Sequence, residues 1–90
     1  MIQYEIKITG RVQGVGFRYF TQKKAAGIGI KGWVKNSRDG GVLVTAQGNE
    51  TDLNTFIDYL QIGPTLSRVD GISKVKMQIV TEFLDFKITF

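Results

Sequence analysis

Apolar and polar residues alternate along the first stretch of the chain. In "MIQYEIKITG", isoleucine or tyrosine stands at positions 2, 4, 6 and 8, with polar residues between them. A period of two is typical of a strand that buries one face. Further strands are predicted over Ile30–Asn36, Val42–Gln47, Lys74–Ile79 and Leu84–Phe90. The Asp39-Gly40 pair within "NSRDGG" indicates a hairpin between the second and third strands.

Two segments between these strands have the pattern of helices. Large apolar residues at positions 53, 56, 57 and 60 follow the i, i+3, i+4, i+7 spacing of an amphipathic helix. Asn49 or Thr51 is suited to begin this helix, and Gly63-Pro64 to end it. An earlier helix is predicted from Phe17 to about Ala26, followed by glycines at positions 27 and 29 that can end it.

The predicted order is β-α-β-β-α-β with an added C-terminal strand. Because each strand has one apolar face, we expect an antiparallel sheet covered on one face by the two helices. The expected fold is therefore an α+β, ferredoxin-like α/β sandwich that residues 1–90 form as a single domain. This topology supports many functions, so the function has to be argued from a site.

The composition narrows the chemistry that this chain can perform. It contains no cysteine and no histidine, which removes disulfides, thiol nucleophiles, imidazole acid–base catalysis and nearly all zinc sites. No apolar run is long enough to span a membrane, and the N-terminal segment lacks the apolar stretch of a signal peptide. We therefore expect no metal, no cofactor, no membrane association and a cytoplasmic location.

Positive charge is concentrated in the first part of the chain. Residues 1–38 carry eight lysines and arginines and one glutamate, a net charge of +7, whereas residues 39–90 carry four against seven acids, a net charge of −3. This asymmetry is explained either by a solvated basic face or by an anionic partner that approaches the first half.

Three glycines and an arginine lie where the first predicted strand leads into the first helix. The stretch "GRVQGVGFR" has glycine at positions 10, 14 and 16, followed by Arg18. A turn of this kind directs free backbone N–H groups into one concavity, where the helix dipole adds positive charge. The planar guanidinium of Arg18 suits two phosphate oxygens. The stretch predicts a phosphate site; a tight connection with a surface arginine is the structural alternative.

Neither of two common nucleotide-binding motifs accounts for the glycines. "GIGIKG" (Gly27–Gly32) has the G-x-G-x-x-G spacing, but it follows a predicted helix and leads into a strand, the reverse of the dinucleotide-binding order. We interpret it as the end of a helix. The P-loop pattern also fails, because no Gly-Lys-Ser/Thr follows the loop at Gly10–Gly16.

Two stretches carry a resemblance to a known family. "GRVQGVGFR" resembles, position for position, the first signature of the acylphosphatases, and "GWVKNSRDGGVLVTAQG" (Gly32–Gly48) resembles their second signature. The similarity continues through "GPTLSRVDGI" and "FKI" to the C-terminus, so it covers essentially the whole chain. It implies an enzyme that hydrolyses acyl phosphates to a carboxylate and inorganic phosphate.

The resemblance also implies roles for individual residues. Arg18 would bind the substrate phosphate, and Asn36 would hold the attacking water. The phosphate would be surrounded by a run of backbone amides, those of Gln13, Gly14, Val15, Gly16, Phe17 and Arg18. Inorganic phosphate and other anions are expected to compete for this site. Taken alone, Asn36 is better explained as the first residue of a turn, and only the two signatures together favour the role of holding water.

The expected chemistry is compatible with this limited set of side chains. An acyl phosphate expels a carboxylate whose conjugate acid has a pKa of about 4, so the leaving group needs no general acid. Loose phosphoryl transfer needs mainly positioning and charge stabilisation. We expect the substrate phosphate itself to accept the proton of the water, because Asp39 is better explained by the hairpin.

Two other functions share parts of this pattern. An RNA-binding module of the RRM type has the same element order, but it needs exposed aromatic residues on its first and third strands. The outward positions of these strands carry Gln3, Glu5, Lys7 and Thr9, and then Leu43, Thr45 and Gln47. We therefore expect no nucleic-acid partner. A non-catalytic anion-binding or regulatory domain with the same loop is the other alternative.

Two further expectations concern the surface. Trp33 should lie on the sheet face opposite to Ile30 and Val34, either as a partly covered structural residue or near the acyl group of the substrate. The lysine-rich fourth strand and the last strand are expected at the sheet edges, where charge discourages pairing with other chains. A monomer is therefore expected.

Overall fold

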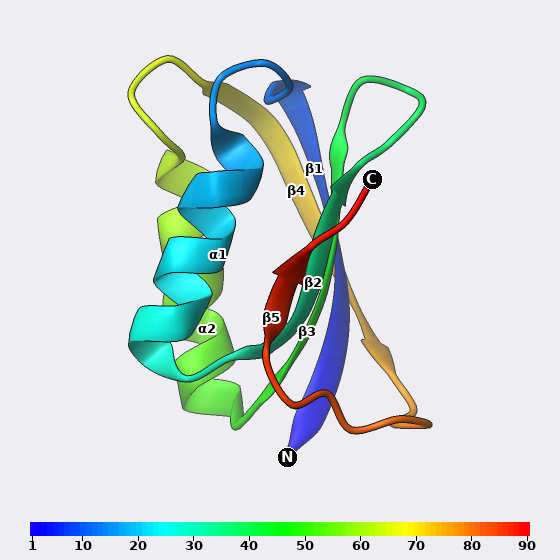
Figure 1. Ribbon diagram of the computed structural model, residues 1–90. Helices are drawn as coiled ribbons and strands as arrows, with labels where there is room; N and C mark the ends of the chain where they lie inside the picture. The colour runs from blue at the N-terminus through cyan, green and yellow to red at the C-terminus, as the bar shows by residue number, and fades with distance from the viewer.

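Five strands form one sheet, and two helices cover one of its faces (Figure 1). The computed structural model describes residues 1–90. Its elements are β1 (Ile2–Arg11), α1 (Phe17–Ile28), β2 (Lys31–Asn36), β3 (Val42–Gly48), α2 (Glu50–Ile62), β4 (Arg68–Met77) and β5 (Phe86–Ile88). The strand order across the sheet is β4-β1-β3-β2-β5. The predicted ferredoxin-like sandwich, with both late strands at the edges, is confirmed.

The sheet is antiparallel except at one edge. β1 pairs antiparallel with both β3 and β4, and β2 pairs antiparallel with β3. β5 instead runs parallel to β2, with Gly32 opposite Phe86 and Val34 opposite Ile88. The added C-terminal strand therefore makes the sheet mixed, a detail that the predicted antiparallel sheet did not include.

The core lies between the helices and one face of the sheet. Alternate residues of the central strands point toward the helices, and Ile6 and Ile8 of β1 are fully buried there. From the other side, Phe17 of α1 and Leu53 and Phe56 of α2 complete a cluster of 16 buried apolar residues. The positions expected to form the apolar face of α2 are therefore the ones it buries.

The two helices begin differently. At α2, the side chain of Asn49 accepts a hydrogen bond from the N–H of Asp52 at 2.8 Å, so Asn49 rather than Thr51 caps the helix. α1 has no such cap: its first turn follows Gly16, and no side chain bonds to the N–H groups there. Neither helix is long and apolar enough to cross a membrane.

β4 begins six residues earlier than predicted and ends two residues earlier. The expected strand over Lys74–Ile79 is wrong in extent, since β4 spans Arg68–Met77. The pairing with β1 shifts between Thr9 and Gly10, where Gly71 and Val69 are the successive partners. This bulge inserts Asp70 as an extra residue, which breaks the period of two that would have revealed the strand.

The last strand is also shorter than expected, and two polar residues of β3 that lie on the open face as expected, Thr45 and Gln47, are buried rather than exposed. β5 covers Phe86–Ile88, and Leu84 lies outside it, almost fully exposed. Gln47, expected on the open face, is completely buried. Its amide group donates to the carbonyl of Thr81 and accepts from the N–H of Phe83, so the segment before β5 covers it.

Candidate active site

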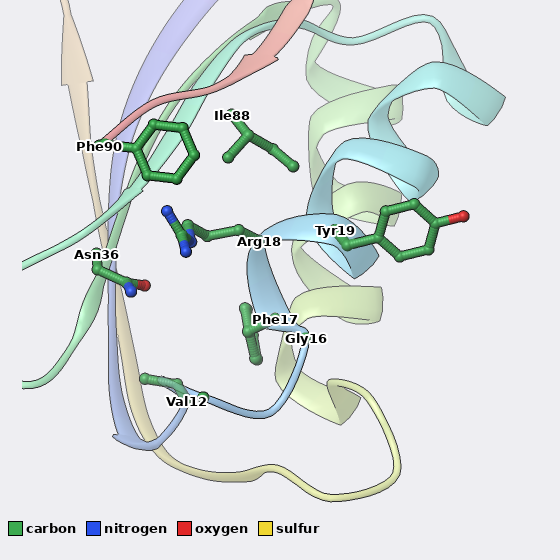
Figure 2. A pocket seen from close by; sticks show the side chains of 9 residues that line it. Val12, Gly16, Phe17, Arg18, Tyr19, Asn36, Ile88 and Phe90 are labelled. Carbon is green, nitrogen blue, oxygen red and sulfur yellow. The ribbon is translucent and has the colours of Figure 1, made fainter.

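Three segments meet at one end of the sheet: the loop after β1, the hairpin between β2 and β3, and the C-terminal residues (Figure 1). Between them lies a cavity of about 260 Å³. Figure 2 shows Arg18 in its middle, with Asn36 on one side and Tyr19 on the other. The lining residues are Val12, Gly14, Gly16, Phe17, Arg18, Tyr19, Asn36, Ile88 and Phe90.

The loop before α1 supplies backbone donors. Gly14 and Gly16 adopt left-handed conformations, with φ of 73° and 78°, which other residues rarely adopt. No hydrogen bond within the protein uses the N–H groups of residues 13–16. The first residues of α1 likewise lack a helical partner four residues earlier. A run of free N–H groups at the positive end of a helix dipole is a favourable environment for an anion.

Arg18 extends from the first turn of α1 into the cavity. Its Nη1 donates to the carbonyl oxygen of Thr89 at 3.3 Å, and its guanidinium carbon lies 4.7 Å from the centre of the Phe90 ring. No carboxylate lies within salt-bridge distance of it, because the two ion pairs of the protein join Lys7 to Asp39 and Arg68 to Asp70. The positive charge of Arg18 is therefore not neutralised within the protein.

Asn36 is the last residue of β2, and strand parity directs its side chain to the helix side. It pairs with Val42, which in turn pairs with the buried Ile8 on the same face of the sheet. The Asn36 side chain makes no hydrogen bond within the protein, and its polar atoms are not buried. Figure 2 shows its amide directed toward the guanidinium of Arg18. Both amide functions are thus free to bind a ligand or water.

Hydrogen bonds hold the hairpin that follows Asn36. Lys7 donates to the hydroxyl of Ser37 and forms an ion pair with Asp39, whose carboxylate also accepts from the N–H of Gly41. The hydrogen bond from Lys7, and then that from Gly41, lowers the pKa of Asp39 to about 2. Asp39 therefore belongs to the hairpin, as expected, and it does not line the cavity.

Most residues expected at the site line the cavity, and four others join them. Gly14, Gly16, Phe17, Arg18 and Asn36 are among the lining residues, whereas Gln13 and Val15 are not. Four lining residues were not among those expected at the site: Val12, Tyr19, Ile88 and Phe90. The apolar alternation of the last strand placed Ile88 and Phe90 on one face, which was the available signal for both.

The polar residues of the cavity include one positive charge and no negative charge. The loop, Arg18 and Asn36 form a polar group, and no aspartate or glutamate side chain lines the cavity. No cluster of three or more Asp, Glu, His or Cys side chains is present that could hold a metal ion. Trp33 lies elsewhere: it pairs with Thr45 on the face away from the helices, and it lines a separate hollow with residues 82–85, Lys87 and Thr89. The geometry suits the binding of a small anion beside a water.

Comparison with known proteins agrees with this geometry. A sequence model of the family described as "Acylphosphatase" matches residues 4–88. An acylphosphatase of Archaeoglobus fulgidus is 43% identical over 90 residues, which is 100% of both chains. An acylphosphatase of Bacillus subtilis is 41% identical over 90 residues, covering 100% of this chain and 99% of the relative.

Solved structures show the same similarity. The crystal structure of an acylphosphatase from Bacillus subtilis has a TM-score of 0.96 and 41% sequence identity, and each chain is fully covered. A full-length HypF in a phosphate- and nucleotide-bound form has a TM-score of 0.91 and 36% identity. The match covers 99% of this chain but only 12% of the HypF chain.

Proposed function

The chain belongs to the acylphosphatase family, and on this premise we propose that it hydrolyses acyl phosphates at the cavity around Arg18 and Asn36. The products are a carboxylate and inorganic phosphate. The observation that carries the proposal is the joint position of the free N–H groups of the loop, an unneutralised arginine and an unpaired asparagine amide around one cavity.

The phosphate group binds to the loop and to Arg18. The backbone N–H groups of residues 13–18 donate to its oxygens, and the left-handed glycines leave the main chain accessible. The guanidinium of Arg18 donates to two of the same oxygens with its remaining N–H groups. As charge develops on these oxygens in the transition state, the fixed donors stabilise it without having to reorganise.

Asn36 positions the attacking water. Its carbonyl oxygen accepts from the water, and an amide cannot serve as a general base at neutral pH. With no carboxylate lining the cavity, a phosphate oxygen of the substrate takes the proton. The water oxygen forms a bond to phosphorus while the bond from phosphorus to the acyl oxygen breaks, and the carboxylate leaves with that electron pair. The departing group has a conjugate-acid pKa of about 4, so it requires no protonation.

The test is hydrolysis of benzoyl phosphate in the presence of EDTA by the wild type, Arg18→Ala and Asn36→Ala. Loss of a donor to developing charge typically lowers the rate by about 10²–10³-fold. Arg18→Ala should lower kcat/KM by at least this factor and weaken competitive inhibition by inorganic phosphate. Asn36→Ala should lower kcat by about 10²-fold and leave inhibition by phosphate unchanged.

Two control variants keep the result specific. Arg11→Ala removes an exposed arginine that does not line the cavity, and Asn54→Ala removes an exposed asparagine of α2. Both should retain wild-type turnover. If the wild type binds phosphate but does not hydrolyse benzoyl phosphate, the protein is an anion-binding domain instead.

The proposal includes a cytoplasmic monomer that acts without metal, membrane or nucleic acid. Support comes from the edges of the sheet: β4 carries Lys74 and Lys76, and β5 is only three residues long. The open face offers no aromatic platform for bases, since Thr45 and Gln47 at its centre are buried. Light scattering at micromolar concentration should give the mass of one chain, and phosphate binding should survive dialysis against EDTA.

A further inference from the structure

The side chain of Gln13 joins the phosphate loop to the hairpin that carries Asn36. Its Nε2 donates to the carbonyl oxygen of Ser37 at 2.7 Å and to that of Gly41 at 2.9 Å. Both N–H groups of the amide are therefore used, and both acceptors belong to the hairpin. The side chain of Gln13 does not line the cavity, so its role there is not direct contact with a ligand.

Both carbonyls belong to the turn that directly follows β2, where each also accepts a backbone hydrogen bond. The N–H of Ser37 donates to the carbonyl of Gly41 at 2.8 Å, which closes the hairpin directly after Asn36. The Gly41 oxygen thus accepts from both Ser37 and Gln13. The amide of Gln13 consequently binds the hairpin at Ser37, the residue next to Asn36, which is proposed to hold the water.

We infer that Gln13 is a positioning residue that fixes the distance between the phosphate, held by the loop, and the water, held by Asn36. This inference rests on the function proposed above. The loop sets where phosphorus lies, and the hairpin sets where the water lies, yet the two belong to different elements. Since a misplacement of about 1 Å between reacting groups can lower a rate by roughly 10²-fold, a direct link between these elements bears on turnover.

The same hairpin is held independently from its other side. Lys7 donates to Ser37 Oγ at 2.8 Å and to Asp39 at 2.9 Å. These bonds stabilise the turn but do not reach the phosphate loop. Lys7→Met therefore loosens the hairpin without cutting its link to the loop, which makes it a matched control for Gln13→Met.

The experiment compares Gln13→Met, Gln13→Asn, Lys7→Met, Asn36→Ala and the wild type. Methionine has the length of glutamine without the donors, and asparagine keeps the amide but is one carbon too short to reach both carbonyls. Two variants are used so that a folding defect in one leaves the other to decide. For each protein, kcat on benzoyl phosphate and the inhibition constant of inorganic phosphate are measured, and circular dichroism reports folding.

We expect both Gln13 variants to lower kcat by about 10–100-fold while the inhibition constant of phosphate stays within about twofold of the wild type. Lys7→Met should keep kcat within about twofold. An unchanged kcat in a folded Gln13 variant overturns the inference. A parallel loss of phosphate binding also overturns it, because that result would assign the Gln13 side chain to the phosphate site itself. An equal loss in Lys7→Met would show that only the rigidity of the hairpin matters.

The proposed function fails in a recognisably different way. In that case the wild type itself would not hydrolyse benzoyl phosphate, or Asn36→Ala would retain full turnover. A wild type that is active and dependent on Asn36, with Gln13 variants that are fully active, rejects the positioning role alone.

Discussion

The guanidinium carbon of Arg18 lies 4.7 Å from the centre of the Phe90 ring. Thr89, the residue before Phe90, accepts a hydrogen bond from Arg18 Nη1 through its carbonyl oxygen. The arginine is therefore held by the segment that follows β5, although it belongs to the first turn of α1. Phe90 is otherwise almost entirely exposed.

The first prediction concerns this contact. An exposed cation–π interaction contributes about 0.5–1 kcal/mol, so Phe90→Ala should weaken the binding of inorganic phosphate by roughly two- to fivefold, because the guanidinium is less well oriented. Phe90→Tyr keeps an aromatic face and should bind as the wild type does. Competitive inhibition measures both. Equal inhibition constants for alanine and wild type would show that the ring does not orient Arg18.

The second prediction concerns two glycines with opposite surroundings. A Cβ added at Gly10, where φ is 124°, would lie 2.1 Å from the carbonyl oxygen of Arg68, which is backbone of the neighbouring strand. Gly10→Ala should therefore lower the free energy of unfolding by about 2–5 kcal/mol. Gly27 lies within α1 with no atom near its Cβ position, and Gly27→Ala should raise the free energy by up to about 1 kcal/mol.

Urea unfolding followed by circular dichroism measures both changes. Because both variants replace glycine by alanine, comparing them separates the steric clash of the added Cβ from the general effect of removing a glycine. A Gly10→Ala protein as stable as the wild type would contradict the register of β1 with β4 at the bulge.

The helices and the central strands could be predicted because their cause is local. The apolar spacing of α2 and the alternation in β1 indicate which side chains are buried, and reading these patterns requires no knowledge of contacts with distant segments. β4 was misplaced because its bulge at Asp70 puts both Val69 and Ile72 against the core, three positions apart. No period of two survives such an insertion, and only the pairing with β1 reveals it.

The same distinction applies to the site. Arg18 could be proposed because a glycine loop before a helix is a local signal. The role of Asn36 was implied by the resemblance to the acylphosphatase signature, since its place at the end of a strand indicates only a turn. The positions of Thr89 and Phe90 depend on β5 running parallel to β2, which is a contact between distant parts of the chain. The link from Gln13 to the hairpin is of this second kind as well.

The third prediction is a pH dependence of stability. The hydrogen bond from Lys7, and then that from the N–H of Gly41, lowers the pKa of Asp39 from 3.8 to about 2 in the folded protein. A lowered folded-state pKa stabilises the protein above the unfolded-state pKa, and this contribution is lost as the pH falls toward the folded-state value. Asp39→Asn should therefore be less stable than the wild type at pH 5, and the difference should shrink between about pH 4 and pH 2.

A double-mutant cycle identifies the partner. In the Lys7→Met background the Asp39→Asn substitution should have a smaller effect at pH 5, because the hydrogen bond from Lys7 is the largest cause of the shift. Urea midpoints at several pH values supply the data. A difference between wild type and Asp39→Asn that stays constant from pH 5 to pH 2 would exclude the lowered pKa of Asp39 as its origin.

The last prediction concerns Gln47, a fully buried amide on the sheet face away from the helices. Its Nε2 donates to Thr81 at 2.6 Å, and its Oε1 accepts from the N–H of Phe83 at 3.0 Å. Gln47→Leu would leave both backbone groups without partners, at about 1–3 kcal/mol for each group that stays buried. We expect lower stability and an earlier proteolytic cut in residues 78–85, because that segment separates from the sheet to hydrate its backbone.

Thr45→Val, on the same face, removes a hydroxyl that makes no hydrogen bond within the protein, and should change the free energy of unfolding by less than about 0.5 kcal/mol. If both variants cleave at the wild-type rate, the amide does not hold this segment, and apolar contacts of Phe83 and Phe86 must do so instead.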